Sequence, residues 1–260
     1  MLCVGIDAGS RAIKVVLMDA GSLELIASGV ADQGVEHNTL ALRLFDQVLE
    51  SSGCTRDDVS RIVATGYARN GVSIAHTTIT EITCHAYGVH HLVPDTMTIV
   101  EIGGQDSKLL RLNSEGAVYD FAMNDRCAAG TGRFLELVAA RLAVGLQALG
   151  EMAARSQKPA AISSMCAVFA ETEIIGLLAS GVAQEDIAAG VQASVAARVA
   201  TMAGRNLTLP IIFTGGVAMI PGMNKALESA LGQPVSVAPD PQMTGAVGAA
   251  ILASNQLRHA

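Results

Sequence analysis

Two of the five cysteines stand where a thiol could hold a metal or a redox centre. Cys127 lies in the segment 124–136 and Cys166 in the segment 163–171, and the sequence predicts a helix directly after each. A thiol at a helix N-terminus faces unpaired backbone N–H groups and the positive end of the helix dipole, which favours its thiolate. Two thiolates are half the set that most zinc and iron–sulfur sites need. One chain cannot complete such a site with these two residues alone, whereas a symmetric dimer could.

The sequence around the other three cysteines does not indicate metal binding or redox chemistry. Cys3 lies in an apolar strand, Cys84 inside an expected helix and Cys54 in a polar turn. The odd count and the lack of a C-x-x-C pair argue against a disulfide framework. We therefore expect Cys3 and Cys84 to be small buried apolar residues and Cys54 to be incidental.

A repeated acidic hairpin is the clearest element around these cysteines. Residues 6–17 and 100–110 both read as apolar strand, acid, any residue, glycine, four residues, lysine and apolar strand, with Asp7 and Glu101 as the acids. Glycine lets the backbone approach a phosphate, the acid can hold Mg²⁺ through water, and the lysine can neutralise phosphate charge. A single hairpin of this kind could be a purely structural turn. The repeat predicts two duplicated domains that bind a nucleotide.

A third glycine-rich element supports a nucleotide site. Residues 209–218 form an apolar run that leads into Gly215 and Gly216 and then into an expected helix. Strand and helix signals alternate along the chain, which indicates an α/β fold. Open α/β sheets bind ligands beyond the carboxyl ends of their strands, where these glycines would lie. A tight strand-to-helix turn without a ligand is the alternative.

The composition narrows the class of partner and the compartment. The chain has 260 residues, half of them hydrophobic, a net charge of −7 and a pI near 5.3. An acidic protein is a poor fit to nucleic acid or to an anionic membrane surface. No apolar run approaches the roughly 20 residues that span a bilayer, and the N-terminus has no signal-peptide pattern. We expect a cytoplasmic protein with neither a nucleic-acid nor a membrane partner.

The motifs together resemble those of the actin, Hsp70 and sugar-kinase ATPase superfamily. The runs N-D-R-C-A-A-G-T-G-R-F-L-E around Cys127 and S-S-M-C-A-V-F-A-E-T-E around Cys166 narrow the resemblance. They resemble the activator ("archerase") of 2-hydroxyacyl-CoA dehydratases, in the BadF/BadG/BcrA/BcrD-type ATPase family, which includes the ATP-binding subunits of benzoyl-CoA reductase. Residues 65–70, 80–86 and 245–250 extend the match to nearly the whole chain.

The resemblance implies a fold and a division into domains. The expected architecture is α/β, with two ribonuclease-H-like (actin/Hsp70-type) domains, an ATP cleft between them and a homodimer bridged by an iron–sulfur cluster. Residues 1–97 would form the first domain, with a C-terminal helix over 243–260 packing back on it. Residues 98–242 would form the second domain, which carries the cluster cysteines.

The resemblance also implies a function and its cofactors. The expected protein is an ATP-dependent electron-transfer activator that passes a low-potential electron to a 2-hydroxyacyl-CoA dehydratase or a related radical acyl-CoA enzyme. One 4Fe–4S cluster per homodimer would be held by Cys127 and Cys166 of both chains. ATP or ADP with Mg²⁺ would drive a change of shape, and reduced ferredoxin or flavodoxin would be the electron donor.

The resemblance also implies which residues form the site. The first phosphate loop comprises Asp7, Ser10, Arg11, Ala12, Ile13 and Lys14, and the second comprises Gly103, Gly104, Gln105 and Asp106. Nucleoside contacts include Gly215, Gly216 and Gln242. Gly130 and Thr131 are further expected cofactor-binding residues, and they link the nucleotide site to the Cys127 segment. The hydrolytic water would be positioned near Mg²⁺ by Asp7, Gln105 or Asp106.

Two residues depart from the pattern of the resembled family. Arg11 stands where a small hydroxyl residue is usual, and Glu101 stands where Asp is usual. The first change would alter how the loop meets the phosphates. The extra methylene of the second would alter the distance to Mg²⁺.

Other functions remain compatible with parts of the pattern. A small-molecule kinase of the same superfamily needs a carboxylate base, for which Asp125 is the candidate, although it adjoins the cysteine motif. An ATP-binding subunit of a benzoyl-CoA-type reductase would share all of the motifs. A nucleotide sensor whose dimer is bridged by zinc would also use four cysteines.

Overall fold

The computed structural model describes residues 1–164, 166–204 and 207–258, and these fall into two compact units. The first unit comprises Met1–Asp95, Leu112–Val118 and Gln242–Ala260, and the second comprises Thr96–Arg111 and Tyr119–Pro241. Each unit is built on one five-stranded mixed sheet. Among the described residues, no helix is both long and apolar enough to cross a membrane.

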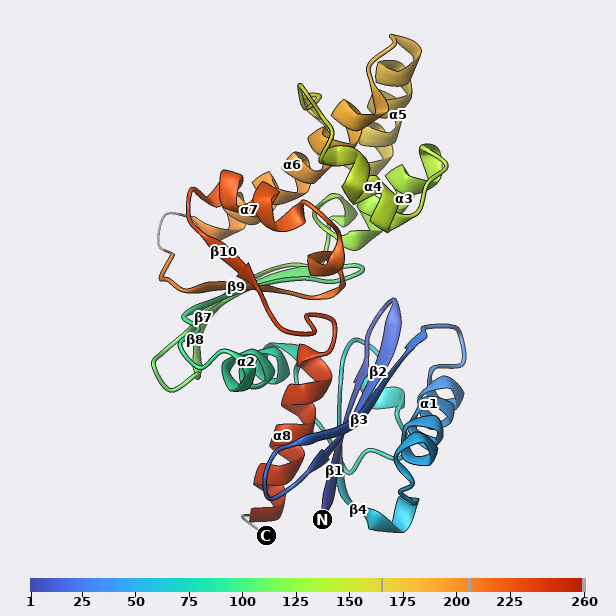
Figure 1. The fold of residues 1–260 in the computed structure, drawn as a ribbon, viewed down its shortest axis with the longest axis vertical. Helices are drawn as coiled ribbons and strands as arrows, with labels where there is room; N and C mark the ends of the chain where they lie inside the picture. Colours follow the sequence, from blue (N-terminus) through green and yellow to red (C-terminus); the bar gives the residue numbers. More distant parts are fainter. Residues whose placement is uncertain (165, 205–206, 259–260) are drawn as a thin grey trace. The chain divides into compact units, whose positions relative to one another are not determined.

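The first unit surrounds a sheet with the strand order β3-β2-β1-β4-β5 (Figure 1). Its elements are β1 (Leu2–Ala8), β2 (Ala12–Asp19), β3 (Leu25–Asp32), α1 (His37–Ser52), the 3₁₀ turn η1 (Arg56–Asp58), β4 (Val59–Thr65), the 3₁₀ turn η2 (Arg69–Gly71), β5 (Thr77–Thr78), α2 (Glu81–Leu92) and α8 (Thr244–Arg258). The strands β1, β2 and β3 pair antiparallel, and β4 pairs parallel to β1.

Alternate side chains of the first sheet face different helices. Val15 and Leu17 join the apolar cluster of α1, whereas Val16 and Met18 join that of α8. Because successive strand residues point to opposite faces, both faces of β2 are buried. This explains why β1 and β2 read as continuous apolar runs rather than as alternating ones.

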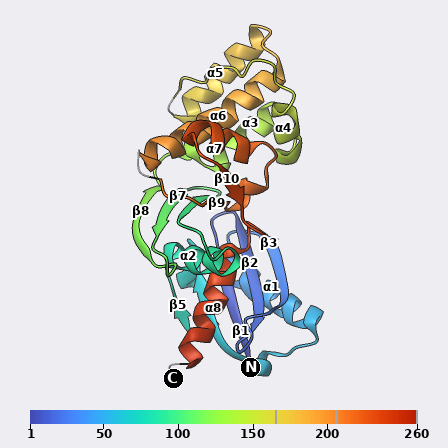
Figure 2. The same cartoon turned by 60° about the vertical axis from the view of Figure 1, so that its left-hand side comes forward.

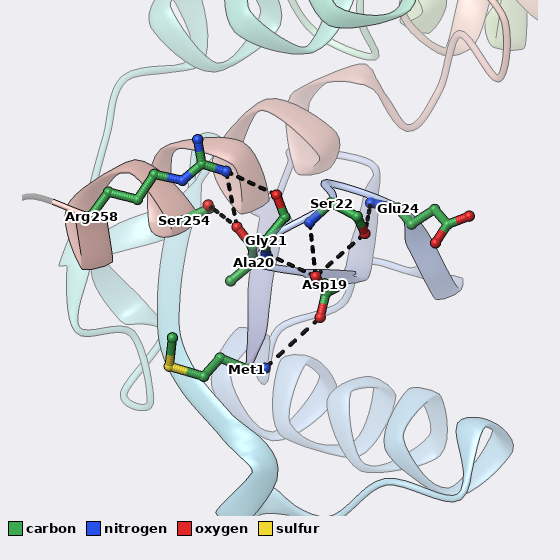
Figure 3. Close-up of polar contacts among 8 residues, drawn as sticks. All are labelled: Met1, Asp19, Ala20, Gly21, Ser22, Glu24, Ser254 and Arg258. Carbon is green, nitrogen blue, oxygen red and sulfur yellow. Dashed lines mark hydrogen bonds and ion pairs between the residues drawn. The ribbon is translucent and has the colours of Figure 1, made fainter.

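The helix expected over residues 243–260 is α8, which contacts β1, β2 and β4. Its last two expected residues, 259 and 260, lie outside the described part of the chain. Figure 3 shows how its end holds the turn after β2: Ser254 Oγ donates to the carbonyl of Ala20 over 2.7 Å, and the Arg258 guanidinium donates to the same carbonyl and to that of Gly21. In the same turn Asp19 accepts the Gly21 and Ser22 N–H groups. These backbone hydrogen bonds hold the pKa of Asp19 below its usual value.

The second unit repeats the sheet order of the first as β10-β9-β6-β7-β8 (Figure 2). Its elements are β6 (Thr98–Ile102), β7 (Ser107–Leu112), β8 (Val118–Asn124), the 3₁₀ turn η3 (Ala128–Gly130), α3 (Gly132–Arg141), α4 (Leu146–Ala153), α5 (Ala167–Ala179), α6 (Gln184–Ala203), β9 (Ile211–Thr214), the 3₁₀ turn η4 (Gly216–Met219), α7 (Met223–Leu231) and β10 (Val235–Val237). The five strands correspond in order to β1 to β5.

The predicted duplication is therefore confirmed at the level of the sheets. In each unit the first strand lies between its hairpin partner, which is antiparallel, and a later strand, which is parallel. The units differ in the helices that come after the third strand. Between β3 and β4 the chain forms the helix α1, whereas between β8 and β9 the described residues form α3, α4, α5 and α6. Cys127 lies between β8 and α3, and Cys166 lies directly before α5.

Candidate functional site

The hairpin of the first unit pairs the expected acid with the expected lysine. Asp7 and Lys14 lie opposite each other in the ladder of β1 and β2, and Lys14 Nζ lies 3.0 Å from Asp7 Oδ2. The aspartate is 5% exposed, and the lysine side chain is 14% exposed. Because burying a carboxylate without a partner is costly, the Lys14 ammonium provides the polar contact that Asp7 needs at the end of β1.

At the tip of this hairpin, mainly backbone groups and only a few side chains are available to a ligand. Gly9 N–H donates to Ala12 O over 3.1 Å, which closes the turn. Arg11 is exposed and Ser10 is half-buried, whereas the side chains of Ala12 and Ile13 are buried in the core. Of the residues expected in this loop, Ala12 and Ile13 can therefore offer a phosphate only their backbone groups, and Ser10, Arg11 and Lys14 can offer side chains.

Two glycines lie against the carboxylate of Asp7. Gly66 follows β4 with φ of +93°, and a Cβ built on it would lie 2.5 Å from Asp7 Oδ1 and 2.4 Å from the carbonyl oxygen of Ala8. A Cβ on Gly245, in the first turn of α8, would lie 3.2 Å from Asp7 Oδ2. Only glycine fits at Gly66, because both the backbone conformation and the space exclude a side chain.

Helix α2 fixes the start of α8 beside the same carboxylate. His85 Nδ1 lies 2.9 Å from Thr244 Oγ1, and both residues are buried. The helices approach closely: a Cβ on Gly88 would lie 1.9 Å from the Thr244 carbonyl oxygen, and one on Gly248 would lie 1.7 Å from the Cys84 carbonyl oxygen. Cys84 is inside a helix and buried, as its sequence setting predicts.

The hairpin of the second unit has the same register with a more deeply buried charge. Glu101 and Lys108 lie opposite each other in β6 and β7, and Lys108 Nζ lies 2.9 Å from Glu101 Oε2. The Lys108 ammonium also forms an ion pair with Asp106, and only 2% of the Lys108 side chain is exposed. The carboxylate of Glu101, on its longer side chain, therefore pairs with a lysine whose ammonium also pairs with Asp106.

The turn of this hairpin contains the expected second phosphate loop. Gly103 N–H donates to Asp106 O over 3.0 Å. Gly103, Gly104 and Asp106 are half-buried, and Gln105 is exposed. Gly215, after β9, has φ of +89°, and a Cβ on it would lie 2.4 Å from the Ile102 carbonyl oxygen and 2.8 Å from Glu101 Oε1.

Gly215 is thus the counterpart of Gly66, which sequence reasoning did not include among the site residues. Each follows a Thr at the end of the strand that lies parallel to the acid-bearing strand, as Thr65-Gly66 and Thr214-Gly215. That shared Thr-Gly pair was the available signal. Gly215 is held by Pro241 O, which accepts from Gly215 N–H over 2.9 Å and from Thr214 Oγ1 over 2.7 Å.

The expected helix after Gly215 begins later than the sequence indicates. Gly216–Met219 forms the 3₁₀ turn η4, and α7 begins at Met223. Gly216 is exposed, and Gln242 is half-buried directly after Pro241.

Cys127 is held at the start of a single 3₁₀ turn rather than directly before an α-helix. It is the N-cap residue of η3, and α3 begins only at Gly132. Asn124 brackets it: the Asn124 side chain accepts from Cys127 N–H over 3.1 Å and donates to Cys127 O over 2.9 Å. The sequence-based prediction missed this turn because the run of Ala and Gly after Cys127 carries no capping signal for it.

The Cys127 segment is hydrogen-bonded to the second hairpin. At the start of α3, Gly132 N–H donates to Gly103 O over 2.9 Å, and Arg133 N–H donates to Gly104 O over 2.8 Å. Thr131 is fully buried and its hydroxyl donates to Ala128 O over 2.7 Å. A displacement of the Gly103–Gly104 turn would therefore act on α3, and through Thr131 on the turn that comes after Cys127.

Cys166 is exposed at the N-cap position of α5, as predicted. Its carbonyl accepts from Ala170 N–H over 2.8 Å, which is the first turn of the helix. Glu173, two turns into α5, reaches back and accepts from the N–H groups of Ser163 and Ser164 and from the Ser163 hydroxyl. Partial burial by itself raises the pKa of Glu173, but these hydrogen bonds outweigh it and lower the pKa to about 2.

Apart from Cys54, which is half-buried, the thiols fall into two chemical classes. Burial raises the pKa of Cys3 to about 11 and that of Cys84 to about 12, so these two are inert. Cys127 is half-buried and Cys166 is exposed. In the part of the chain that the structure describes, no three His, Cys, Asp or Glu side chains gather in a group that could hold a metal ion. The donor set of one chain is a pair of accessible thiols at N-cap positions, which suits half of a four-thiolate centre.

Comparison with known proteins gives one consistent match. A model of the BadF/BadG/BcrA/BcrD ATPase family matches residues 4–253. The activator of lactoyl-CoA dehydratase from Anaerotignum propionicum is 44% identical over 254 residues, which are 97% of either chain.

Solved structures give the same match. The activator of the 2-hydroxyisocaproyl-CoA dehydratase from Clostridium difficile, with bound ADPNP, has a TM-score of 0.94 at 38% identity and covers 100% of this chain and 96% of its own. Component A of the Acidaminococcus fermentans (R)-2-hydroxyglutaryl-CoA dehydratase has a TM-score of 0.94 at 39% identity, over 99% of both chains. A ROK family glucokinase from Streptomyces griseus, at 13% identity and a TM-score of 0.61, shares the fold alone.

Proposed function

Because this chain belongs to the BadF/BadG/BcrA/BcrD ATPase family, we propose that it is an ATP-dependent electron-transfer activator of a 2-hydroxyacyl-CoA dehydratase. The observation that carries the proposal is the direct hydrogen bonding between a glycine turn and a thiol-bearing segment. Gly103 and Gly104 accept the first N–H groups of α3, and α3 follows Cys127 after one 3₁₀ turn. A nucleotide that moves the turn would thereby move the thiol.

Both glycine hairpins are suited to handling phosphates and Mg²⁺. In the first, the turn after Gly9 and the side chains of Ser10 and Lys14 can contact phosphate oxygens, and Asp7 can hold Mg²⁺ through water. In the second, Gly103, Gly104 and Gln105 can contact phosphate, and Asp106 or Gln105 can orient the hydrolytic water. Gly215, Gly216 and Gln242 would contact the nucleoside.

The accessible thiols are suited to an iron–sulfur centre shared between two copies of the chain. Cys127 and Cys166 supply two thiolates per chain, so four come from a homodimer. A 4Fe–4S cluster, when bound, takes up and releases one electron at low potential. The N-terminal ends of η3 and α5 would place backbone N–H groups near its negative charge. Zinc would use the same donors, which makes metal analysis part of the test.

The proposed partners are those of an electron-transfer activator. The acceptor would be a 2-hydroxyacyl-CoA dehydratase or a related reductase, and the donor a reduced ferredoxin or flavodoxin in the cytoplasm. The small-molecule kinase alternative is less supported. The Streptomyces griseus glucokinase is only 13% identical to this chain, so their similarity shows the fold alone. Asp125, the candidate base of that alternative, is exposed in the turn before Cys127.

The test is activation of a purified dehydratase component under anaerobic conditions. We expect reduced protein with ATP to start dehydration of the 2-hydroxyacyl-CoA, and reduced protein with ADP to leave the enzyme inactive. Cys166→Ser should abolish activation, and the matched Cys54→Ser variant should retain it. Activation without ATP, or with the Cys166→Ser protein, would contradict the proposal.

A further inference from the structure

Arg198, on α6, contacts both cysteine-bearing segments. It is not part of either hairpin and is not among the residues that the sequence singles out. Its side chain lies in the second unit, as do both thiols. Its contacts with these segments indicate a role in the candidate site formed by the two thiols.

The guanidinium holds the segment that leads into Cys166. Arg198 Nη2 donates to the carbonyl of Ser164 over 3.0 Å, two residues before the cysteine. The other arm of the same group, Nη1, donates to the carbonyl of Ser194 over 2.8 Å and to the Ser194 hydroxyl, one turn earlier on α6. The planar fork is thus anchored on its own helix while it reaches across to Ser164.

The aliphatic part of the same side chain lies against the segment that contains Cys127. A Cβ built on Gly130 would lie 3.3 Å from Arg198 Cδ and 3.6 Å from Arg198 Cβ. It would also lie 3.0 Å from Nδ2 of Asn124, the residue that brackets Cys127. The arginine stem and the asparagine amide therefore lie on the same side of Gly130, where a larger residue would meet both.

We propose that Arg198 is a positioning residue that fixes the two thiol-bearing segments relative to each other. The inference rests on the proposed function, since it concerns the metal centre that Cys127 and Cys166 would hold. Residues that orient metal ligands without touching the metal commonly change metal affinity by about 10- to 100-fold when replaced. The role needs both arms of the guanidinium and its stem, so a positive charge alone is insufficient.

Three variants separate positioning from charge and from general stability. Arg198→Ala removes the contacts, and Arg198→Lys keeps the charge but cannot span Ser194 and Ser164 together. Arg155→Ala is the matched control, because Arg155 is an exposed arginine of the same unit that donates to the Glu151 carbonyl. The readouts are iron release to a chelator from the anaerobic dimer, and amide hydrogen exchange of the metal-free protein.

We expect both Arg198 variants to release iron about 10- to 100-fold faster than the wild type, and the control to match the wild type. In the metal-free protein, both Arg198 variants should exchange faster at Ser163–Ser164 and at Cys127–Gly130. Wild-type iron retention and exchange in Arg198→Lys would overturn the proposal, because charge alone would then suffice.

The exchange measurement also separates this proposal from the proposed function. If the wild type holds no iron, the proposed function fails, but exchange still decides the role of Arg198. Faster exchange in both segments supports it, and a change in only one segment, or in neither, overturns it.

Discussion

The two units share one hairpin design and use it in different surroundings. In the first, Lys14 pairs among the described residues with Asp7 and keeps some exposure, and two thiols of that unit, Cys3 and Cys84, are buried in the core. In the second, Lys108 is buried between two carboxylates, and the turn is hydrogen-bonded to a helix that follows an accessible thiol. From this difference we infer that the first hairpin is arranged to bind a ligand. The second is arranged to transmit the movement that ligand binding causes.

The largest expected contrast is in thiol reactivity, between the buried Cys3 and Cys84 of the first unit and the exposed Cys166 of the second. Burial raises the pKa of Cys3 from 9.0 to about 11 and that of Cys84 to about 12. Their thiolate fractions at pH 8 are thereby reduced about 100-fold and about 1,000-fold. With iodoacetamide and peptide mass spectrometry of the metal-free folded protein, Cys166 should be modified first. Modification of Cys3 or Cys84 as fast as Cys166 would remove the contrast.

The second contrast is in the cost of removing each hairpin lysine. Lys108→Met leaves Glu101 and Asp106 without their shared ammonium and should lower the free energy of unfolding by about 3–5 kcal/mol. Lys14→Met removes a single, more exposed partner and should lower it by about 1.5–3 kcal/mol. Nucleotide affinity should show the reverse order, with the greater loss in Lys14→Met. Urea denaturation and nucleotide titration measure the two quantities.

If Lys108→Met folds poorly, a double variant can still test this prediction. Glu101→Gln combined with Lys108→Met removes both charges of the Glu101–Lys108 pair and should recover part of the lost stability. Equal losses of stability for Lys14→Met and Lys108→Met would show that the two hairpins are not differently built.

The glycines beside the acids should respond alike in the two units. Gly66→Ala and Gly215→Ala each place a Cβ at positive φ and 2.4 Å from a carbonyl oxygen. Each should lower the free energy of unfolding by about 1–3 kcal/mol from backbone strain, with a further loss from crowding of the carboxylate. Gly181→Ala is the control, since its φ is +80° with no atom within 4 Å. Losses no greater than that of Gly181→Ala would contradict the role given to crowding.

The smallest expected effect concerns the polar support of the Cys166 segment. The folded state lowers the pKa of Glu173 from 4.5 to about 2. The stabilisation is therefore present above pH 4.5 and is lost as the pH falls from about 4.5 toward 2. Hydrogen exchange at Ser163 and Ser164, corrected for intrinsic rates, should rise over this range.

Two variants check that assignment. In Glu173→Gln the exchange at Ser163 and Ser164 should be fast at neutral pH and independent of pH over the same range. Glu151→Gln, on α4 and exposed, should behave as the wild type. A wild-type pH profile in Glu173→Gln would show that another group controls the segment.

The sequence predicts the local features of this molecule and misses those that depend on folding. The repeat around Asp7 and Glu101 predicts both hairpins because acid, glycine and lysine lie within eight residues in each. Cys166 and its helix are likewise predicted from local pattern. The signal for Gly66 is its match to Gly215, since each follows a Thr at the end of a strand. Arg198 contacts Ser164 and the Gly130 segment from far along the chain, and no local signal places these groups together. The deep burial of Lys108 depends on the fold in the same way.

The most direct test of the shared centre is native mass spectrometry of the anaerobically purified protein. We predict two chains that carry one 4Fe–4S cluster, and loss of the cluster in both Cys127→Ser and Cys166→Ser. Cys54→Ser should retain it. A cluster on a single chain, zinc in place of iron, or a cluster that survives either cysteine substitution would contradict a centre shared between two copies of the chain.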